Sequence, residues 1–466
     1  MTKIGLEIHC QLNTQTKLFC GDLTNSNNAM PNENTCPICL GFPGYKPKIN
    51  KKAIDFTIMT GIALECNITK EALFSRKTYF YPDLSKNYQI TQYEMPVAEH
   101  GQLAISDKKI RIRRVHLEED PAQIAYVGGD ITSAEYTLIN YNRSGTPLIE
   151  IVTEPDFTTP REARDFLEKL SSILEHLGVY EPTKEGSIRV DANISTEGER
   201  VELKNITGFE NVEKALNFEI IRQNGVVRMG EKVGRETRHF DANTNITKKL
   251  RSKETEEDYG YIFDPDLPVI KIDESWVGKI SSTMPELPDI RIARFVKEYN
   301  LDEYDSKVII YYDKNLADFF EECCKIYGNP KIIANWMSNY LLKSLNWRSE
   351  RIKDSKVKPK TFVELLEMID KKEITERYAK ELIKEYVDTG ISPRKLLGNN
   401  KMQLSKEEIK AIVKKTLEED KTVVEELRAG KMEALQFLIG QILSLTKKQA
   451  DPKEIKNMIM EEIKKD

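Results

Sequence analysis

The sequence predicts an α+β protein whose N-terminal part is rich in strands and whose C-terminal part is helical. Up to about residue 290, short runs of alternating apolar and polar residues are broken by Gly, Pro and Asn. Beyond that point, apolar residues recur at helical spacing almost throughout. The length of 466 residues also exceeds what one hydrophobic core usually serves. We therefore predict three domains: residues 1–290 with a mainly antiparallel sheet, an all-α linker over 291–397 and an all-α tail over 398–466.

The stretch IGLEIHCQL, residues 4–12, is the first predicted strand. Its alternation places Glu7 and His9 on one polar face, and Cys10 on the apolar face with Ile8 and Leu12. A carboxylate and an imidazole two residues apart can both reach one hard cation or one proton path. Taken alone, the stretch is explained more simply by a solvated polar face.

Later stretches add carboxylates at the ends of predicted strands, in KKIRIRRVHLEED, GTPLIEIVTEPD and GSIRVDANIS. In the first of these, alternation places Glu119 with Val115 and Leu117 on an apolar face, where a buried carboxylate needs a partner. The polar face of the third carries Ser187, Arg189 and Asp191. Three carboxylates and a histidine can form an oxygen-rich Mg²⁺ site if the fold brings them together, which the sequence alone does not show.

The cysteines predict a zinc site near the N-terminal strand. Cys36-Pro-Ile-Cys39 is a knuckle whose two thiols can bind one Zn²⁺, and Cys20 lies upstream as a third ligand. Asp22, two residues past Cys20, is the better-placed fourth ligand. The alternative is a set of buried or free thiols. Unevenly spaced cysteines favour a reducing compartment over a disulfide scaffold, and three of the seven have only a packing role: Cys66, Cys323 and Cys324.

The stretch RKTYFYPDLSKNYQITQ, residues 76–92, combines basic and aromatic side chains, namely Lys77, Tyr79, Tyr81, Lys86 and Tyr88. Such a surface suits a nucleotide or the end of a nucleic acid, because lysines neutralise phosphates and rings stack on bases. A strand with ordinary core and edge tyrosines explains the stretch equally well. The chain contains neither G-x-x-x-x-G-K-[ST] nor G-x-G-x-x-G, so any use of ATP needs another kind of cradle.

Helices are expected where caps frame an amphipathic pattern. Residues 161–178 follow Pro160 and end at Gly178, and residues 361–390 predict a helix pair. The tail holds further helices, and one of them opens on the capping pair Ser405 and Glu408.

Composition and charge predict a soluble, cytoplasmic protein with no membrane partner. Hydrophobic residues make up 39% and charged residues 31% of the chain, and no signal-peptide pattern or long apolar run is present. Residues 1–340 hold 42 Lys and Arg against 52 Asp and Glu, whereas residues 341–466 hold 28 against 23. The C-terminal part is the better candidate for a polyanionic partner, although charge alone favours a solvated helical surface.

Many of these motifs together resemble one family. The segments IGLEIHCQL, CPICLGFPG, RKTYFYPDLSKNYQITQ, HLEEDPA, NRSGTPLIEIVTEPD, EGSIRVDANIS, VELKNITGF and GRETRHFDANT occur in the order seen in the B subunits of the aspartyl/glutamyl-tRNA(Asn/Gln) amidotransferases, the GatB family. The C-terminal segments ELPDIRIARF, NWMSNYL and LQFLIGQILSLTKKQADP fit the same family. The likeness therefore runs from end to end.

The resemblance implies a cradle-shaped catalytic domain, a helical linker and a tail similar to the YqeY proteins. It also implies ATP-dependent phosphorylation of the side-chain carboxylate of Asp or Glu mischarged onto tRNA(Asn) or tRNA(Gln). Ammonia from a partner, the glutaminase or A subunit, then displaces the phosphate, and the small C subunit holds the two together. ATP, Mg²⁺ and a structural Zn²⁺ are the implied cofactors.

The resemblance further assigns roles to residues of this chain. It places Glu7, His9, Glu119 and Asp191 around Mg²⁺. Around ATP and the aminoacyl end of the tRNA it places Lys77, Tyr79, Tyr81, Lys86, Ser187 and Arg189. The tail is expected to hold the tRNA body through Lys401, Lys431, Lys447 and Lys448.

Two departures from the family pattern stand out. Asp22 replaces a cysteine found in many relatives, and Gly260 replaces an arginine, which removes a cationic contact or leaves it to a neighbour. Two other functions fit the sequence less well. A tRNA-binding adaptor would use the acidic residues only structurally, and the related, Glu-tRNA-specific E subunit would need a large inserted segment that this sequence lacks. No amidase Ser-Ser-Lys pattern is evident either, which argues against a free-standing glutaminase.

Overall fold

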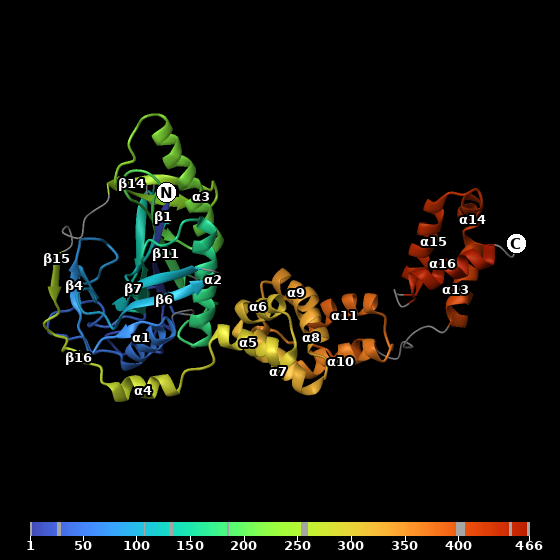
Figure 1. Cartoon of the computed structure of the whole chain (residues 1–466), viewed down its shortest axis with the longest axis horizontal. Coiled ribbons are helices and arrows are strands. Elements are labelled where there is room, and N and C mark those ends of the chain that lie inside the picture. Colours follow the sequence, from blue (N-terminus) through green and yellow to red (C-terminus); the bar gives the residue numbers. More distant parts are fainter. Residues whose placement is uncertain are drawn as a thin grey trace. The chain divides into compact units, whose positions relative to one another are not determined.

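The structure is a computed structural model that describes residues 2–25, 29–106, 108–129, 134–183, 186–252, 260–397, 406–446 and 450–463. It contains two compact units, Met1–Pro288 and Asp289–Asp466. The first is built on a sheet and the second is helical (Figure 1). The predicted α+β fold is therefore confirmed, with strands confined to the first unit among the described residues.

A 12-stranded sheet organises the first unit. Its main path runs β14 (Ile246–Ser252), β13 (Glu236–Asp241), β12 (Val201–Ile206), β11 (Ile188–Ser195), β1 (Lys3–Gln11), β10 (Pro147–Thr153), β7 (Lys108–Glu119), β5 (Tyr88–Thr91), β4 (Ser75–Thr78) and β15 (Gly260–Phe263). Off this path, β6 (Ala98–Ile105) pairs with β7, and β2 (Asn67–Ile68) pairs with β6. All these pairs are antiparallel except β12 with β13. The prediction of a mainly antiparallel sheet is correct.

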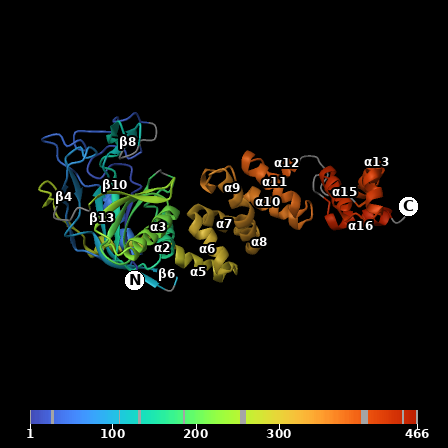
Figure 2. The same cartoon turned by 90° about the horizontal axis from the view of Figure 1, so that it is seen from above.

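Helices cover the apolar face of this sheet. The buried side chains of β1, including Ile4, Leu6 and Ile8, belong to one core together with Phe166 and Leu170 of α2 (Pro160–His176). This core also includes residues of α1 (Lys51–Ala63) and α3 (Phe209–Arg228). The helices α2 and α3 lie side by side against the sheet (Figure 1, Figure 2). On the opposite face of the sheet, the central strands carry polar side chains.

Local sequence explains the observed bounds of α2. The hydroxyl of Thr159 accepts a hydrogen bond from the Glu162 amide, and Pro160 occupies the first turn, where its missing N–H costs nothing. At the other end, Gly178 adopts φ +70°, a left-handed conformation that stops a helix at little cost. The helix predicted over 161–178 is thus confirmed.

Smaller elements complete the first unit. Two short ribbons pair β16 (Ile270–Lys271) with β3 (Glu71–Ala72), and β8 (Gln123–Val127) with β9 (Tyr136–Asn140). The 3-10 turn η1 (Tyr141–Arg143) follows β9, and α4 (Glu274–Ser282) comes near the end of the unit.

The second unit contains two groups of helices with separate hydrophobic clusters. The first group comprises α5 (Pro288–Tyr299), α6 (Glu303–Tyr312), α7 (Lys314–Ile326), α8 (Pro330–Trp336), the π-helical turn η3 (Met337–Leu341), α9 (Leu342–Trp347), the 3-10 turn η4 (Ile352–Asp354), α10 (Pro359–Asp370), α11 (Glu376–Thr389) and α12 (Pro393–Leu397). The second comprises α13 (Lys406–Glu419), α14 (Lys421–Arg428), α15 (Met432–Leu445) and α16 (Pro452–Ile463). The helix pair predicted over 361–390 is confirmed as α10 and α11.

The predicted boundary between linker and tail, at 397/398, adjoins residues outside the described ranges and stays a prediction. Among the described residues, no helix is long and apolar enough to cross a membrane.

Candidate functional site

The polar face of the central sheet carries three cross-strand rows of side chains over β7, β10, β1 and β11. The first row runs Arg114, Val152, Glu7 and Asp191. The second runs His116, Glu150, His9 and Arg189, and the third runs Glu118, Leu148 and Gln11. Successive rows lie two residues apart along each strand, about 7 Å. Acidic and basic groups from distant parts of the chain therefore meet on one face.

His9 forms a group with two carboxylates of this face, which we call the His9 cluster. His9 Nε2 lies 3.6 Å from Glu118 Oε1 and 3.5 Å from Glu150 Oε2. Ligand atoms of these three residues lie within 4.8 Å of one another, which is close enough for one metal ion. Glu150 also reaches His116, whose Nε2 is 3.3 Å away. His116 is almost fully buried and thereby orients Glu150 from behind.

The titratable groups of the His9 cluster are buried and lie close together, and both conditions shift their pKa values. Burial raises the pKa of Glu118, and the charge of Glu150 raises it further. Burial also acts to raise the pKa of Glu150, but its contacts with His116 and His9 outweigh this and hold that pKa well below its usual range. Burial acts to lower the pKa of His9, yet the hydrogen bond to Glu150 and the charges of both carboxylates raise it to about 9. The cluster therefore attracts positive charge.

A second group, the Glu7 cluster, lies beside the first. It brings Glu7 together with Asp191 and Glu202 of β12. Lys204 Nζ lies 2.8 Å from Asp191 Oδ2 and 3.3 Å from Glu202 Oε1. Asn205 donates its backbone N–H to Asp191 Oδ1 at 2.7 Å. Burial, followed by the charges of Glu150 and Asp191, raises the pKa of Glu7, which shows that the two clusters interact.

Glu119 does not lie with either cluster, which corrects the expectation that it joins Glu7, His9 and Asp191. Its carboxylate lies 2.6 Å from Lys86 Nζ and accepts a hydrogen bond from the Ile90 amide. Alternation along β7 gives the physical reason, because it turns Glu118 toward His9 and turns Glu119 to the opposite side. The expectation that a buried Glu119 needs a partner is confirmed, and Lys86 is that partner.

The other predicted ligand-binding residues differ in how open they are. Arg189 pairs with the buried Asp120, whose Oδ1 is 2.6 Å from the guanidinium. Ser187 is buried. Lys77 acts electrostatically on Glu118, and its ammonium lies 5.8 Å from the centre of the Tyr79 ring.

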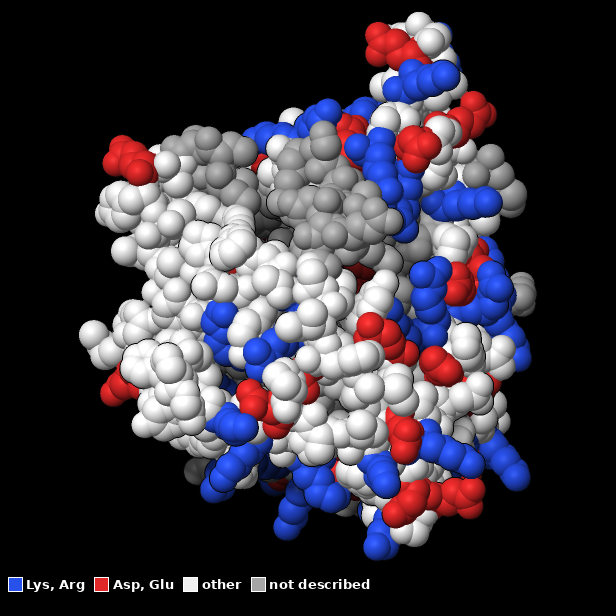
Figure 3. All heavy atoms as spheres, turned by 90° about the vertical axis from the view of Figure 1, so that its left-hand side faces the viewer, with Lys and Arg blue, Asp and Glu red and all other residues white. Residues whose placement is uncertain are grey.

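The loop after β4 is exposed and aromatic. Phe80 is 85% exposed and Tyr81 is 41% exposed. Figure 3 views the unit from the side on which β4 and β15 lie, and its described surface mixes Lys and Arg with Asp and Glu around a broad uncharged area. On this view charge alone marks no continuous basic stripe for a nucleic acid backbone.

Position 260, where the family resemblance led us to expect an arginine, is exposed in this chain. Gly260 pairs with Thr78, and the next residue, Tyr261, pairs with Lys77. Because side chains alternate along a strand, a side chain at 260 would project to the face opposite Tyr261.

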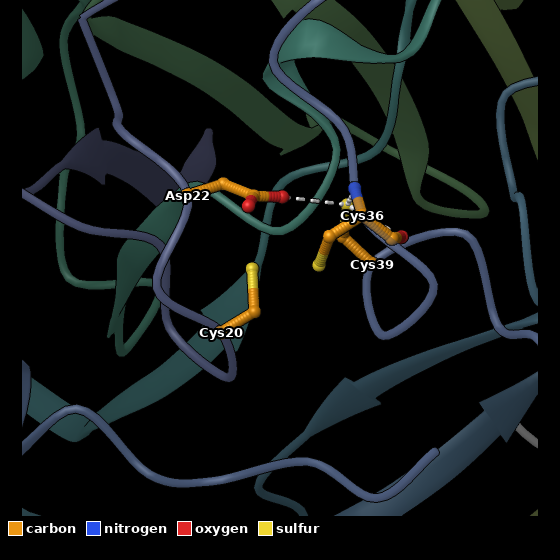
Figure 4. A group of neighbouring side chains, drawn as sticks. All are labelled: Cys20, Asp22, Cys36 and Cys39. Atoms are coloured by element: carbon orange, nitrogen blue, oxygen red, sulfur yellow. Dashed lines mark hydrogen bonds between the residues drawn. The ribbon is translucent and has the colours of Figure 1, made fainter. Parts of the chain in front are cut away.

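The predicted zinc ligands converge in space. Cys20, Asp22, Cys36 and Cys39 point toward one another (Figure 4), and their ligand atoms lie within 4.8 Å of one another. Cys39 Sγ is 3.3 Å from Asp22 Oδ2. The hydrogen bond from Cys20 lowers the pKa of Cys39 to about 6, which favours the thiolate that zinc requires. Three sulfurs and one carboxylate oxygen form a donor set that suits tetrahedral Zn²⁺.

Lys17 supports this group in a way that the sequence did not indicate. Its side chain is fully buried, and Nζ donates to the Asn34 carbonyl at 2.7 Å and lies 3.7 Å from Cys39 Sγ. A buried ammonium beside thiolates offsets part of their negative charge.

Of the four tail lysines predicted to contact tRNA, only Lys431 falls within the described residues, whereas Lys401, Lys447 and Lys448 lie outside them. Lys431 is exposed and pairs with Glu426, with 3.0 Å between Nζ and Oε1. Its proposed contact with tRNA stays a prediction.

Several residues of the site were missed at the sequence level: Lys17, Glu118, Glu150, Glu202 and Lys204. Glu150 had a signal, because it is the single charged residue within the apolar run PLIEIVT. Glu118 also had a signal, because it lies two residues after His116 and therefore shares the face of that histidine, whereas Glu119 does not. Glu202 and Lys204 alternate in VELKN, a pattern common to many surface strands.

The sequence of this chain also matches known protein families. Residues 2–278 match the family model described as the GatB/GatE catalytic domain, and residues 318–463 match the GatB domain. The aspartyl/glutamyl-tRNA(Asn/Gln) amidotransferase B subunit of Sulfolobus acidocaldarius is 46% identical, covering 99% of this chain and all of the relative. The B subunits of Methanospirillum hungatei and Thermotoga neapolitana are 44% and 43% identical, each covering 99% of this chain and 98% of the relative. The chain therefore belongs to the family of aspartyl/glutamyl-tRNA(Asn/Gln) amidotransferase B subunits.

Proposed function

We propose that this chain is the tRNA-activating subunit of a glutamine-dependent amidotransferase. In this role it phosphorylates the side-chain carboxylate of Asp-tRNA(Asn) or Glu-tRNA(Gln) with ATP and then exchanges the phosphate for ammonia. The products are Asn-tRNA(Asn) or Gln-tRNA(Gln), and the reaction is that of an ATP-dependent carbon–nitrogen ligase. Family membership supports the overall reaction, and the site geometry supports the assignment of residues.

The single observation that carries the proposal is the pair of acidic clusters on the polar face of the sheet. Glu118 and Glu150 meet at His9, and Asp191 and Glu202 meet at Glu7. Carboxylates buried this close repel one another, and a divalent cation relieves that repulsion. Carboxylate oxygens suit Mg²⁺, and one imidazole is compatible with a cation of this class.

In this proposal, His9, Glu118 and Glu150 hold Mg²⁺, with His116 fixing Glu150 behind it. Bound there, Mg²⁺ neutralises charge on the phosphates of ATP, which is the main requirement of phosphoryl transfer. The Glu7 cluster and Lys204 lie beside this site. There they bind or orient the other charged substrate, the aminoacyl group of the mischarged tRNA. Lys77 supplies a further positive charge near Glu118.

The chemistry then follows in two balanced steps. A side-chain carboxylate oxygen of the aminoacyl group attacks the terminal phosphorus of ATP, the bond to the leaving oxygen breaks, and ADP departs. Ammonia next attacks the acyl carbon of the resulting acyl phosphate, and inorganic phosphate leaves as the amide forms. The protein positions both partners and supplies fixed charges, which is where most of the rate acceleration in phosphoryl transfer arises.

The proposal also includes partners and a second metal. The names of the relatives describe one component of a larger enzyme, so this chain is expected to work with a glutaminase (A) subunit and a small (C) subunit. The cluster of Cys20, Asp22, Cys36 and Cys39 is proposed to hold a structural Zn²⁺. The helical tail is proposed to hold the body of the mischarged tRNA, and the cytoplasm is proposed as the place of action.

The test is ATP turnover by the reconstituted complex of this chain with its two partner subunits. Mg²⁺-dependent ADP release should require mischarged tRNA and should proceed without glutamine, and hydroxylamine should trap the activated acyl group. Presenting Asp-tRNA(Asn) and Glu-tRNA(Gln) separately identifies the substrate. If the complex binds mischarged tRNA but releases no ADP, the chain acts as a tRNA-binding adaptor instead.

A further inference from the structure

Arg114 stands in the first cross-strand row, on the same face of the sheet as both acidic clusters. It pairs across the ladder with Val152, which in turn pairs with Glu7 of β1. It lies two residues before His116 on β7, so the two side chains share the polar face. Arg114 therefore borders the proposed reaction site, yet the proposed function gives it no task.

The guanidinium of Arg114 lacks the anionic partner that its neighbours have. Its Nε–H is buried and has no hydrogen-bond partner, and among the described residues no carboxylate forms an ion pair with it. By contrast, Arg113 binds Glu154 through two hydrogen bonds of 2.9 and 3.0 Å, and Arg111 is bound in the same way to Asp156. Burying an unmatched cationic donor costs free energy, so such a group calls for a partner.

The surroundings hold the guanidinium in place without neutralising it. Its central carbon lies 5.8 Å from the centre of the Tyr93 ring, and Tyr93 stacks on Tyr261 with 4.2 Å between ring centres. The Tyr261 hydroxyl interacts electrostatically with Glu150, Glu118 and Arg114. Arg114 therefore lies beside an aromatic ring and near acidic groups, and its buried Nε–H has no hydrogen-bond partner.

We infer that Arg114 binds an oxyanion of the substrates in the amidotransferase reaction. The planar guanidinium matches the geometry of carboxylate and phosphate oxygens alike. Two groups of this chemistry enter the site under the proposed function, on which the inference rests: the side-chain carboxylate of the mischarged aminoacyl group and the terminal phosphate of ATP. Arg114 binds one of them directly and is in that sense a catalytic residue.

The experiment compares Arg114→Gln and Arg114→Lys with the control Arg113→Gln in the full three-subunit complex. Arg113 lies next to Arg114, but its side chain is exposed and paired with Glu154, so its loss changes the same local charge without touching the site. We expect Arg114→Gln to raise KM for one substrate by about 10- to 100-fold, as for a lost charge-assisted hydrogen bond. Arg114→Lys should recover part of the loss, and Arg113→Gln should behave as the wild type.

Two arms identify the oxyanion. If it is the aminoacyl carboxylate, Arg114→Gln weakens equilibrium binding of Asp-tRNA(Asn) and leaves binding of the neutral isostere Asn-tRNA(Asn) unchanged. If it is the phosphate, the variant raises KM for ATP at saturating tRNA and leaves both tRNA affinities unchanged. Thermal melting and the glutaminase activity of the complex serve as controls for folding.

The inference is wrong if Arg114→Gln and Arg113→Gln give the same KM values and affinities. It is equally wrong if Arg114→Gln lowers the melting temperature and slows the reaction with no change in either KM or in binding, since that outcome fits only a packing role against Tyr93. A wild-type complex without tRNA-dependent ATP turnover would instead refute the proposed function, so the two failures are distinguishable.

Discussion

The adjacent residues Glu118 and Glu119 should respond to the same substitution in opposite ways. We expect Glu118→Gln to suppress Mg²⁺-dependent phosphorylation of the aminoacyl group while the fold survives. We expect Glu119→Gln to destabilise the first unit while the phosphorylation chemistry survives in the folded fraction. The reason is that Glu118 belongs to the His9 cluster, whereas Glu119 neutralises the buried Lys86.

The structure sets the size of both effects. The side chains of Glu119 and Lys86 are 6% and 8% exposed, so Glu119→Gln leaves a buried ammonium without its counter-charge. Breaking a buried pair costs about 3–5 kcal/mol, and the lower end applies because Gln keeps the shape. At about 2 °C per kcal/mol for a unit of this size, the melting temperature should fall by about 6 °C. Loss of an outer partner of a metal ligand typically lowers metal affinity or activity about 10- to 100-fold. Because Glu118 is itself a proposed ligand, loss of its charge should lower the phosphorylation rate by at least this factor.

The assay measures ADP release at saturating mischarged tRNA over a range of Mg²⁺ concentrations, together with thermal melting of each variant. For Glu118→Gln, the Mg²⁺ concentration needed for half-maximal rate should rise. The reasoning is refuted if Glu119→Gln shows this metal dependence with an unchanged melting temperature while Glu118→Gln behaves as the wild type. Alternation along β7 would then have assigned the two side chains to the wrong faces.

Three further predictions concern other parts of the chain. Protein purified without added zinc should contain close to one zinc per chain by elemental analysis, and Cys36→Ser should release it and lower the melting temperature, because thiolate ligation adds to folding free energy; equal stability without metal would leave the cysteines as packing residues. A chain ending at Leu397 should bind mischarged tRNA more weakly and with a shallower dependence on salt, because fewer phosphates are neutralised; an unchanged slope would show that the tail makes no such contacts. Burial acts to raise the pKa of Glu321, but hydrogen bonds from Arg294 and Arg291 outweigh it and lower that pKa below 4.5. The stabilisation by this carboxylate is therefore fully present above that value and lost as the pH falls through the lowered pKa, so Glu321→Gln should reduce the melting temperature at pH 7 and reduce it progressively less as the pH falls below 4.5; a pH-independent loss would contradict this origin.

Sequence patterns predicted the fold class because strand alternation and helix caps are local signals. The bounds of α2 follow from Thr159, Pro160 and Gly178, all within one turn of the helix ends. The proposed zinc ligands were predictable for a similar reason, since Cys36 and Cys39 belong to one turn and Asp22 lies two residues after Cys20 in the chain. These features depend on neighbours in sequence, which are visible without the fold.

The composition of the acidic clusters was not predictable in the same way, because it depends on strand register. Glu150 reaches His9 only because β10 pairs with β1 in the register that sets these two residues opposite each other. Shifting the assignment by one residue exchanges Glu118, a proposed metal ligand, for Glu119, the partner of a buried lysine. The unpaired Nε–H of Arg114 was not predictable at all, because the absence of a partner leaves no pattern in the sequence.

The position of β1 in the sheet also affects how the protein is made. Ile8 pairs with Ile151 on one side and Val190 on the other, so this strand is synthesised long before either neighbour. At the usual 5–20 residues per second, the ribosome needs roughly 10–40 s to supply both partners. During that interval the apolar face of β1 has no sheet to join, and its unpaired backbone is a template for wrong pairing. Newborn chains should therefore depend on chaperones that shield this segment until β11 leaves the ribosome.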